Sequence, residues 1–312
     1  MEGKPWVFDA HCDTVYRCWQ TGEGLARNTG AVDLERVERA FGCYAQIFAL
    51  WADPDRAGPG GPEGDYAALL AYARRQLAAN GGRIVLCRTG GEVRRAWAQG
   101  WAAALLSVEG AQLLGCDPGR LERAARDGVR VITLTWNRAN ALSGSHRDHP
   151  KRGLTEQGRR FVRRMGELGL LVDVSHLSPA GFWDVMELSR RPVLATHSNA
   201  RAVWEHTRNL TDGQITAIIK NQGFVGLNFY PDFVGGDRDL DSVRAHLDHI
   251  LELGGEEQVG LGGDWDGGET IPALPDIGAL ERLYEYLLRR HYPEGVVRGL
   301  FYNNLMRVVS LP

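Results

Sequence analysis

The feature that most constrains the fold of this chain is residues 170–208, where two short apolar runs each lead to a histidine. The runs LLVDV and PVLAT come just before His176 and His197. Between them, Ser178 and Pro179 form a helix-start signal, and apolar residues then recur at helical spacing. The segment therefore predicts strand, helix, strand. Since the C-terminal ends of adjacent parallel strands lie side by side, we expect both histidines to project into one site.

The rest of the chain repeats this alternation. Eight strands are predicted at residues 6–10, 43–51, 102–108, 129–135, 170–174, 192–196, 223–230 and 258–263, with residues 84–87 as a short extra strand. Helical patterns separate them, and no internal repeat is present. We therefore predict one domain, residues 1–312, folded as an α/β protein of the (β/α)8 TIM barrel type with a C-terminal helical extension from about residue 278. An open doubly wound sheet is the competing fold, but it would not bring so many strand ends to one point.

Composition limits the partners. The formal net charge of -3 gives no argument for nucleic acid, and no apolar run approaches the ~20 residues that span a bilayer. The chain opens with MEGKPWVFDAHCD and enters a strand without a charged and apolar leader, so we expect a cytoplasmic protein. Its five cysteines are scattered without CxxC spacing, which argues against both disulfides and a thiolate zinc site.

Polar residues end several other predicted strands. His11 and Asp13 follow the first strand, and side-chain alternation predicts that they point the same way, although a polar turn would look similar. Glu109 follows the strand 102–108 and could instead cap the next helix. Asp264 ends the last strand in a glycine-rich context and could be only a helix N-cap. The common position at strand ends favours one shared site over these separate explanations.

Two loops are conspicuous. Residues 52–64 are rich in proline, glycine and charge, and are predicted to be a surface loop or lid. The long loop 136–153 carries His146 and His149 in a charged context, SHRDHPKRG. We interpret these two histidines as belonging to a solvated loop.

Together the strand-end residues provide three imidazoles and three carboxylates: His11, Asp13, Glu109, His176, His197 and Asp264. Imidazole with carboxylate and no thiolate suits two divalent ions, Zn²⁺ with Mn²⁺ or Co²⁺ as alternatives. One carboxylate can bridge such a pair, which lowers the pKa of a bridging water and polarises a carbonyl. The predicted reaction is hydrolysis.

The sequence resembles the membrane (renal) dipeptidases, which are metal-dependent hydrolases of amidohydrolase type. The resemblance runs nearly end to end, through DAHCDT, SVEGAQLL, VITLTWN, GLTEQGRRFVRRMGELGLLVDVSHLS, PVLATHSNAR, RNLTD, GLNFYPDF, VGLGGDWDG and HYPEGVVRGLFYNNLMRVV. It implies a metal-dependent dipeptidase of the soluble bacterial type, because the signal peptide, disulfides and lipid-anchor tail of extracellular members are not seen. A homodimer is compatible with this resemblance.

The resemblance also implies a role for each site residue. His11 and Asp13 would bind one metal, His176 and His197 the other, and Glu109 both. Asp264 would be the acid/base residue that handles the proton of the bridging water. Arg208 and Tyr230 would hold the substrate carboxylate, although from the residues alone Arg208 could be a surface arginine and Tyr230 a packing residue at the barrel rim.

One position departs from the mammalian-type members. They carry a histidine after Thr-Leu-Thr that contacts the oxygen of the tetrahedral intermediate, whereas this chain has Trp136. An indole N–H donates one hydrogen bond but protonates nothing, so Trp136, Asn137 or the metal would stabilise that oxygen, or the substrate differs. We predict a binuclear zinc dipeptidase that acts on a small-molecule dipeptide through a metal-bridging hydroxide and tolerates a D-residue at the C-terminal position. The alternatives are hydrolysis of another small amide or lactam on the same metals, and a metal-binding or interaction protein that has lost activity.

Overall fold

A computed structural model describes residues 3–56 and 58–311, and the sheet at its centre contains nine parallel strands. The strands are β1 (Trp6–Cys12), β2 (Cys43–Leu50), β3 (Ile84–Leu86), β4 (Ala102–Glu109), β5 (Val129–Thr133), β6 (Leu171–Asp173), β7 (Leu194–Ala195), β8 (Phe224–Leu227) and β9 (Val259–Leu261). The predicted strands are all present. Several are shorter than predicted, because the chain leaves the ladder before the polar residues that follow.

The sheet closes into a barrel. β1 pairs with β2 on one side and with β9 on the other, while β2 pairs directly with β4. β3 pairs with residues 102–104 of β4, and β5 pairs further along the same strand, so β3 lies beside the barrel rather than in it. The remaining eight strands form the closed ring, which confirms the (β/α)8 prediction and excludes the open sheet.

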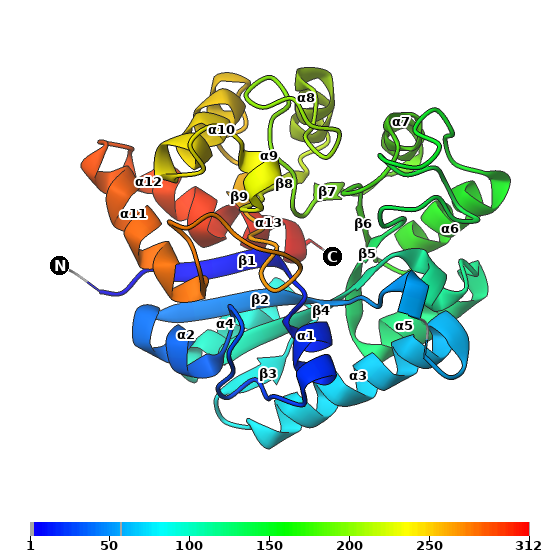
Figure 1. The fold of residues 1–312 in the computed structure, drawn as a ribbon, viewed down its shortest axis with the longest axis horizontal. Helices are drawn as coiled ribbons and strands as arrows, with labels where there is room; N and C mark the ends of the chain where they lie inside the picture. Colours follow the sequence, from blue (N-terminus) through cyan, green and yellow to red (C-terminus); the bar gives the residue numbers. More distant parts are fainter. Residues whose placement is uncertain (1–2, 57, 312) are drawn as a thin grey trace.

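Helices surround this ring (Figure 1). They are α1 (Thr14–Thr21), α2 (Leu34–Ala40), α3 (Gly61–Ala79), α4 (Gly90–Ala98), α5 (Leu121–Asp127), α6 (Glu156–Glu167), α7 (Pro179–Leu188), α8 (Asp212–Lys220), α9 (Pro231–Val234), α10 (Leu240–Glu252), α11 (Leu280–Arg289), α12 (Glu294–Arg298) and α13 (Asn304–Val309). Two of these helices begin at the capping residues that the sequence predicted. Ser178 caps α7, and Thr211 forms a capping box with Gln214 at the start of α8.

The prediction of a loop over residues 52–64 was wrong at its C-terminal end. Gly61 begins α3, with proline in the first helical turn, where its missing N–H costs nothing. Residues 53–56 include a short 3₁₀ turn, and residue 57 lies outside the described residues. The C-terminal helical extension is confirmed from the 3₁₀ turn Ile277–Ala279 onward.

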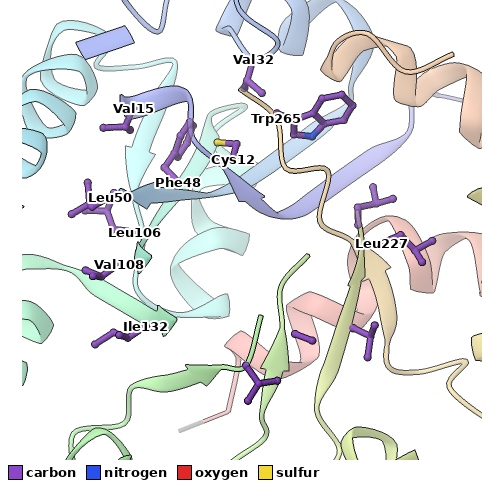
Figure 2. Packing of buried hydrophobic residues seen from close by; sticks show 14 of the residues in the cluster. Cys12, Val15, Val32, Phe48, Leu50, Leu106, Val108, Ile132, Leu227 and Trp265 are labelled. Atoms are coloured by element: carbon purple, nitrogen blue, oxygen red, sulfur yellow. The ribbon is translucent and has the colours of Figure 1, made fainter. Parts of the chain in front are cut away.

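Apolar side chains fill both sides of the ring. Inside it, Phe8, Ile47, Leu105 and Phe224 pack in one cluster with residues from α13, including Leu305. α13 therefore closes the N-terminal end of the barrel. A second cluster lies between the strands and the surrounding helices (Figure 2). With one end sealed by apolar packing, only the C-terminal end of the ring is left for polar chemistry.

Candidate active site

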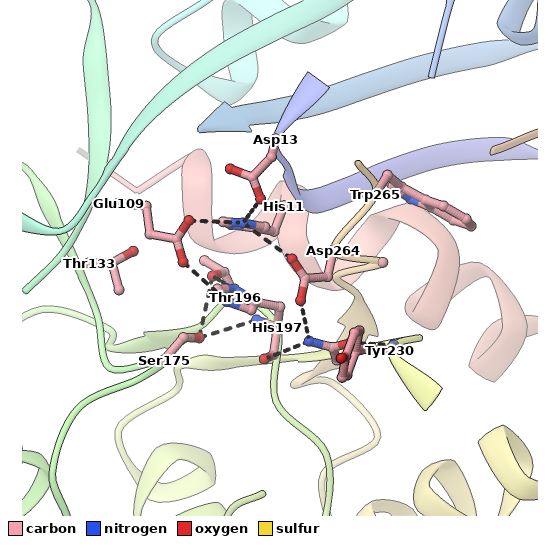
Figure 3. Close-up of polar contacts among 12 residues, drawn as sticks. His11, Asp13, Glu109, Thr133, Ser175, Thr196, His197, Tyr230, Asp264 and Trp265 are labelled. Atoms are coloured by element: carbon pink, nitrogen blue, oxygen red, sulfur yellow. Dashed lines mark hydrogen bonds and ion pairs between the residues drawn. The ribbon is translucent and has the colours of Figure 1, made fainter. Parts of the chain in front are cut away.

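The predicted ligands meet at the C-terminal end of the barrel, and Figure 3 shows His11, Asp13, Glu109 and His197 among them. His11 lies within β1 and Glu109 is the last residue of β4, whereas His176, His197 and Asp264 follow β6, β7 and β9. All of the side chains except that of Asp264 are buried. Five strands thus supply one polar centre, as the strand-end pattern predicted.

Asp13 reaches this centre for a reason that the sequence did not show. It lies beyond β1, at the N-cap of α1, and not on the strand as the alternation argument assumed. The pairing of β1 with β2 shifts between Asp9 and Cys12, so β1 has an irregularity there. The predicted proximity holds, with His11 Nε2 3.4 Å from Asp13 Oδ2. A bulge and a helix start, rather than simple alternation, bring the two groups together.

Glu109 lies between two sets of side chains. Its Oε2 is 3.6 Å from His11 Nε2, and its Oε1 is 3.0 Å from His176 Nε2 and 3.6 Å from His197 Nε2. The two oxygens of one carboxylate therefore face different histidines. This is the arrangement that a carboxylate shared by two ions requires.

The donor set fits bound cations. The Nε2 atoms of His176 and His197 lie only 3.0 Å apart, and the buried Oδ1 of Asp13 has no hydrogen-bond partner among the described residues. Potential ligand atoms converge in two groups, and within each group all of them lie within 4.8 Å of one another. The groups are His11, Glu109 and His197, and His11, Asp13 and Asp264. Converging lone pairs and an unpaired buried carboxylate oxygen are costly without a cation, so these residues suit a metal centre.

Electrostatics lead to the same conclusion. Burial raises the pKa of the Glu109 carboxyl well above its usual range and lowers the pKa values of His176 and His197 far below theirs. Burial also disfavours charged His11, but the nearby carboxylates, Glu109 first, outweigh it and raise the pKa of His11 to about 10. The carboxylates of the centre therefore attract positive charge strongly enough to outweigh burial at His11, and bound cations would supply such charge.

Two buried aspartates, which the sequence analysis missed, support the ligands. Asp173 accepts hydrogen bonds from the Thr133 hydroxyl at 2.6 Å and from the Thr196 hydroxyl at 2.7 Å. The Thr196 Oγ1 lies 2.8 Å from His197 Nδ1. Since the Thr196 proton goes to Asp173, the oxygen accepts from Nδ1–H and leaves Nε2 of His197 free for a metal. In the sequence, the only indication of this role was that Asp173 is a charged residue inside the apolar run LLVDV.

Asp9 holds the ends of β1 and β9 together. Its carboxylate accepts hydrogen bonds from the backbone N–H groups of His11 and Gly263, both at 3.0 Å, and from the Trp265 indole at 3.2 Å. Burial raises the pKa of Asp9, and these hydrogen bonds, with one from Gln46, oppose that rise. The network fixes His11 relative to the segment that carries Asp264.

Asp264 lies at the edge of the centre. Its Oδ1 is 3.7 Å from His11 Nε2, and its Oδ2 accepts a hydrogen bond of 2.9 Å from Asn228 Nδ2. Its backbone has φ +60°, and His176 has φ +65°, the left-handed region that costs an ordinary residue about 1 to 3 kcal/mol. Such strain is typical of functional positions, and here it aims both side chains at the centre.

Arg208 is a buried cation with spare hydrogen-bonding capacity. Its guanidinium donates to the His197 carbonyl at 3.1 Å and to Ser198 Oγ at 3.4 Å, and it lies over the Phe233 ring. No described residue accepts from its buried Nε–H. Burial lowers the pKa of Arg208 while Asp264 and Glu109 oppose that effect. The group is therefore ready for an anion.

A cleft of about 790 Å³ opens over the centre. Its lining includes ligand residues, Tyr230 and Trp136, whereas Arg208 is buried and is not part of the lining. The Trp136 ring centroid is 5.1 Å from that of Trp51 and 6.3 Å from that of His176. The position that departs from the mammalian-type pattern therefore lies directly beside a metal-ligand candidate.

The prediction that both histidines of the loop 136–153 are solvated was half wrong. His149 is exposed, but His146 lines the cleft, and burial together with Arg208 lowers its pKa to about 3. Backbone pairing draws His146 in, because Ser145 bridges to Leu177 and the His146 N–H donates to the His176 carbonyl. A charged context could not reveal that pairing.

Comparison with known proteins agrees with this geometry. The model of the membrane dipeptidase family, peptidase family M19, matches residues 3–311. The chain belongs to this family. An uncharacterized protein in the pqqA 5' region of Klebsiella pneumoniae is 33% identical in an alignment of 264 residues, which covers 81% of this chain and 97% of that relative.

Two solved structures of similar proteins extend the comparison. A metallo peptidase from Rhodobacter sphaeroides, solved with a phosphinate mimic of the dipeptide L-Ala-D-Ala, is 30% identical with a TM-score of 0.88, over 99% of each chain. The dipeptidase AC, a family M19 metallo peptidase, is 32% identical with a TM-score of 0.89, over 99% of this chain and 100% of that one. This member of the membrane dipeptidase family is thus a metal-dependent dipeptidase. Despite the family name, no helix among the described residues is long and apolar enough to cross a membrane.

Proposed function

We propose that this dipeptidase works with two divalent ions, zinc by preference with manganese or cobalt as alternatives. The observation that carries the proposal is Glu109, whose two oxygens face different histidines inside a buried cluster of imidazoles and carboxylates. His11 and Asp13 would hold one ion, and His176 and His197 the other. Bound there, the ions would activate water and polarise the scissile carbonyl.

Asp264 is the proposed acid/base residue. It is the most accessible carboxylate of the centre, with a side chain that is 17% exposed, and it lies on the cleft wall. The Asn228 amide holds one of its oxygens and leaves the other facing His11. In this position Asp264 can take a proton from water and pass it to the leaving amine, and it can also attract the free amine of the substrate.

Arg208 and Tyr230 are the proposed carboxylate-binding pair. Arg208 presents an unpaired Nε–H, and Tyr230 lines the cleft on the same side of the barrel, after β8. A dipeptide has its carboxylate one residue beyond the scissile carbonyl, so an anchor here would select dipeptides over longer chains. Trp136 and Asn137 also line the cleft and are proposed to contact the substrate near the developing oxyanion.

The configuration of the C-terminal residue belongs to the proposal as well. The Rhodobacter sphaeroides relative binds a mimic of L-Ala-D-Ala, and the similarity supports tolerance of a D-residue in this chain. A cytoplasmic location and assembly as a homodimer stay predictions from the sequence.

Hydrolysis of a dipeptide panel by metal-loaded protein tests this function. The panel pairs L-L and L-D dipeptides with a small amide and a lactam, and each substrate is assayed with zinc, manganese and cobalt. We expect kcat/KM for dipeptides to be about 100-fold or more above that for compounds without a free carboxylate. Those compounds cannot form the buried ion pair with Arg208 and leave its charge unpaired. Equal rates on the amide or lactam would favour the more general hydrolase.

A further inference from the structure

His146 takes part in a series of hydrogen bonds that leads from Thr207 to the proposed metal centre. Its Nε2 lies 2.9 Å from Asn137 Oδ1 and its Nδ1 lies 2.8 Å from Thr207 Oγ1. The same Asn137 oxygen lies 2.9 Å from Nδ1 of His176. One amide oxygen therefore joins an imidazole of the loop 136–153 to an imidazole of the metal centre.

The proton positions in this series of hydrogen bonds follow from the proposed metal binding by His176 and from the acceptor character of an amide oxygen. Nε2 of His176 faces Glu109, so a metal would bind that atom and the proton must be on Nδ1. An amide oxygen only accepts, so His176 Nδ1–H and His146 Nε2–H both donate to Asn137. His146 Nδ1 then carries no proton and accepts from the Thr207 hydroxyl. Rotating the amide would place its NH₂ group against Nδ1–H of His176, which leaves both donors without an acceptor.

The two histidines that follow β6 and β7 are supported in different ways. His197 is held from inside the barrel by Thr196 and Asp173. His176 lies beyond its strand with φ +65°, and among the described residues Asn137 is the only hydrogen-bond partner of its Nδ1. The support for His176 thus comes from a loop that is itself anchored through His146.

We infer that His146 is a positioning residue, which acts through Asn137 to fix the tautomer and ring orientation of His176 as a metal ligand. The inference rests on the proposed role of His176 and adds to it a residue outside the ligand set. Outer hydrogen-bond partners of ligand histidines typically change metal affinity by about 10- to 100-fold when removed. Thr207 is the last residue of this series of hydrogen bonds and precedes Arg208 in the sequence. The support for His176 therefore also reaches the segment that carries Arg208, the proposed binding residue for the substrate carboxylate.

Binding of Co²⁺ alone tests this inference without relying on turnover. The affinity is measured by competition with a chelator, and the visible absorption of bound Co²⁺ reports ligand geometry, in wild type, His146→Ala, His146→Gln and His149→Ala. We expect His146→Ala to weaken Co²⁺ binding about 10-fold or more and to alter the spectrum. His146→Gln keeps an N–H donor toward Asn137 and should recover most of both. His149, exposed in the same loop, is the matched control and should match wild type.

Unchanged affinity and spectrum in His146→Ala would overturn the inference, as would equal losses in the Ala and Gln variants, which would indicate loop packing alone. If His146→Ala does not fold, Thr207→Val removes the other end of the chain, and it should weaken Co²⁺ binding several-fold or refute the role. Dipeptide hydrolysis by wild type is scored separately. A wild type without dipeptidase activity whose Co²⁺ affinity still depends on His146 would overturn the proposed function and leave this inference standing.

Discussion

The charge of the buried Glu109 carboxylate is only partly balanced by protein groups. Burial pushes His176 and His197 toward their neutral forms, and His11 and Arg208 do not outweigh burial and the nearby aspartates, because the pKa of Glu109 stays raised. Leaving an ionised carboxylate buried and unpaired costs several kcal/mol, about as much as breaking a buried ion pair. Two divalent ions, as proposed, would remove that cost and make the short separations between His176, His197 and Glu109 favourable. Charge balance as well as position thus supports the proposed ligand assignment.

Asp264→Asn tests the acid/base role at the residue scale. Asparagine keeps the shape and can still accept from Asn228, so metal content should stay at the wild-type level. Losing the proton-transfer group should lower kcat by about 10²- to 10⁴-fold. Asp53→Asn changes another carboxylate of the cleft lining, one outside the proposed ligand set that pairs with Arg56, and this control should keep normal turnover. A wild-type kcat in the Asp264 variant would rule out the role.

Arg208→Ala tests the carboxylate anchor. In wild type, a tripeptide or a dipeptide C-terminal amide would bury an uncharged amide against the guanidinium, which should lower kcat/KM by about 10²-fold or more relative to the free dipeptide. In Arg208→Ala this preference should collapse, mainly because the free dipeptide becomes a poor substrate. Arg208→Lys keeps the charge without the planar fork and should recover part of the preference. Equal kcat/KM for the three substrates in wild type would remove Arg208 from the site.

At the scale of elements, the sequence predicted the barrel because short apolar runs alternate with helical patterns and several of these runs stop at a polar residue. β4, β6, β7 and β9 form where those runs were predicted. Features that depend on contacts between distant segments could not be predicted in this way. The irregularity in β1, the β-bridge that draws His146 into the cleft and the buried support of His197 by Asp173 all arise from partners far along the chain. Local pattern shows where a strand ends, but not what folds back over that end.

Leu305→Ala tests the role of α13 as the element that closes the barrel. Leu305 is 1% exposed and packs with the side chains inside the ring, so its truncation should lower the free energy of unfolding by about 2 to 5 kcal/mol. Leu288, which is 38% exposed on α11, is the matched control and should change stability by less than about 1 kcal/mol on mutation to Ala. Urea unfolding of both variants makes the comparison, and equal losses would contradict the closing role.

For the whole molecule, the metals should contribute to folding stability, because the ligands come from β1, β4 and the segments after β6 and β7. Removing the ions with a chelator should lower Tm, and adding Zn²⁺ should restore it. At free metal 1,000-fold above its Kd, linkage gives about 4 kcal/mol per site. Mg²⁺, which prefers oxygen ligands and keeps its waters, should restore much less. Identical melting curves with and without chelator would argue against a shared metal centre.

The most direct test of the account is the metal content of wild type and Glu109→Ala, measured by elemental analysis together with dipeptide hydrolysis. Wild type should hold two equivalents of metal per chain. Glu109→Ala removes the carboxylate that both sets of ligands share, so it should hold fewer than two equivalents and lose most of its activity. Asp53→Ala, on the cleft rim, should keep both ions. Two equivalents and full activity in Glu109→Ala would contradict the bridging role, and with it the binuclear centre proposed for this dipeptidase.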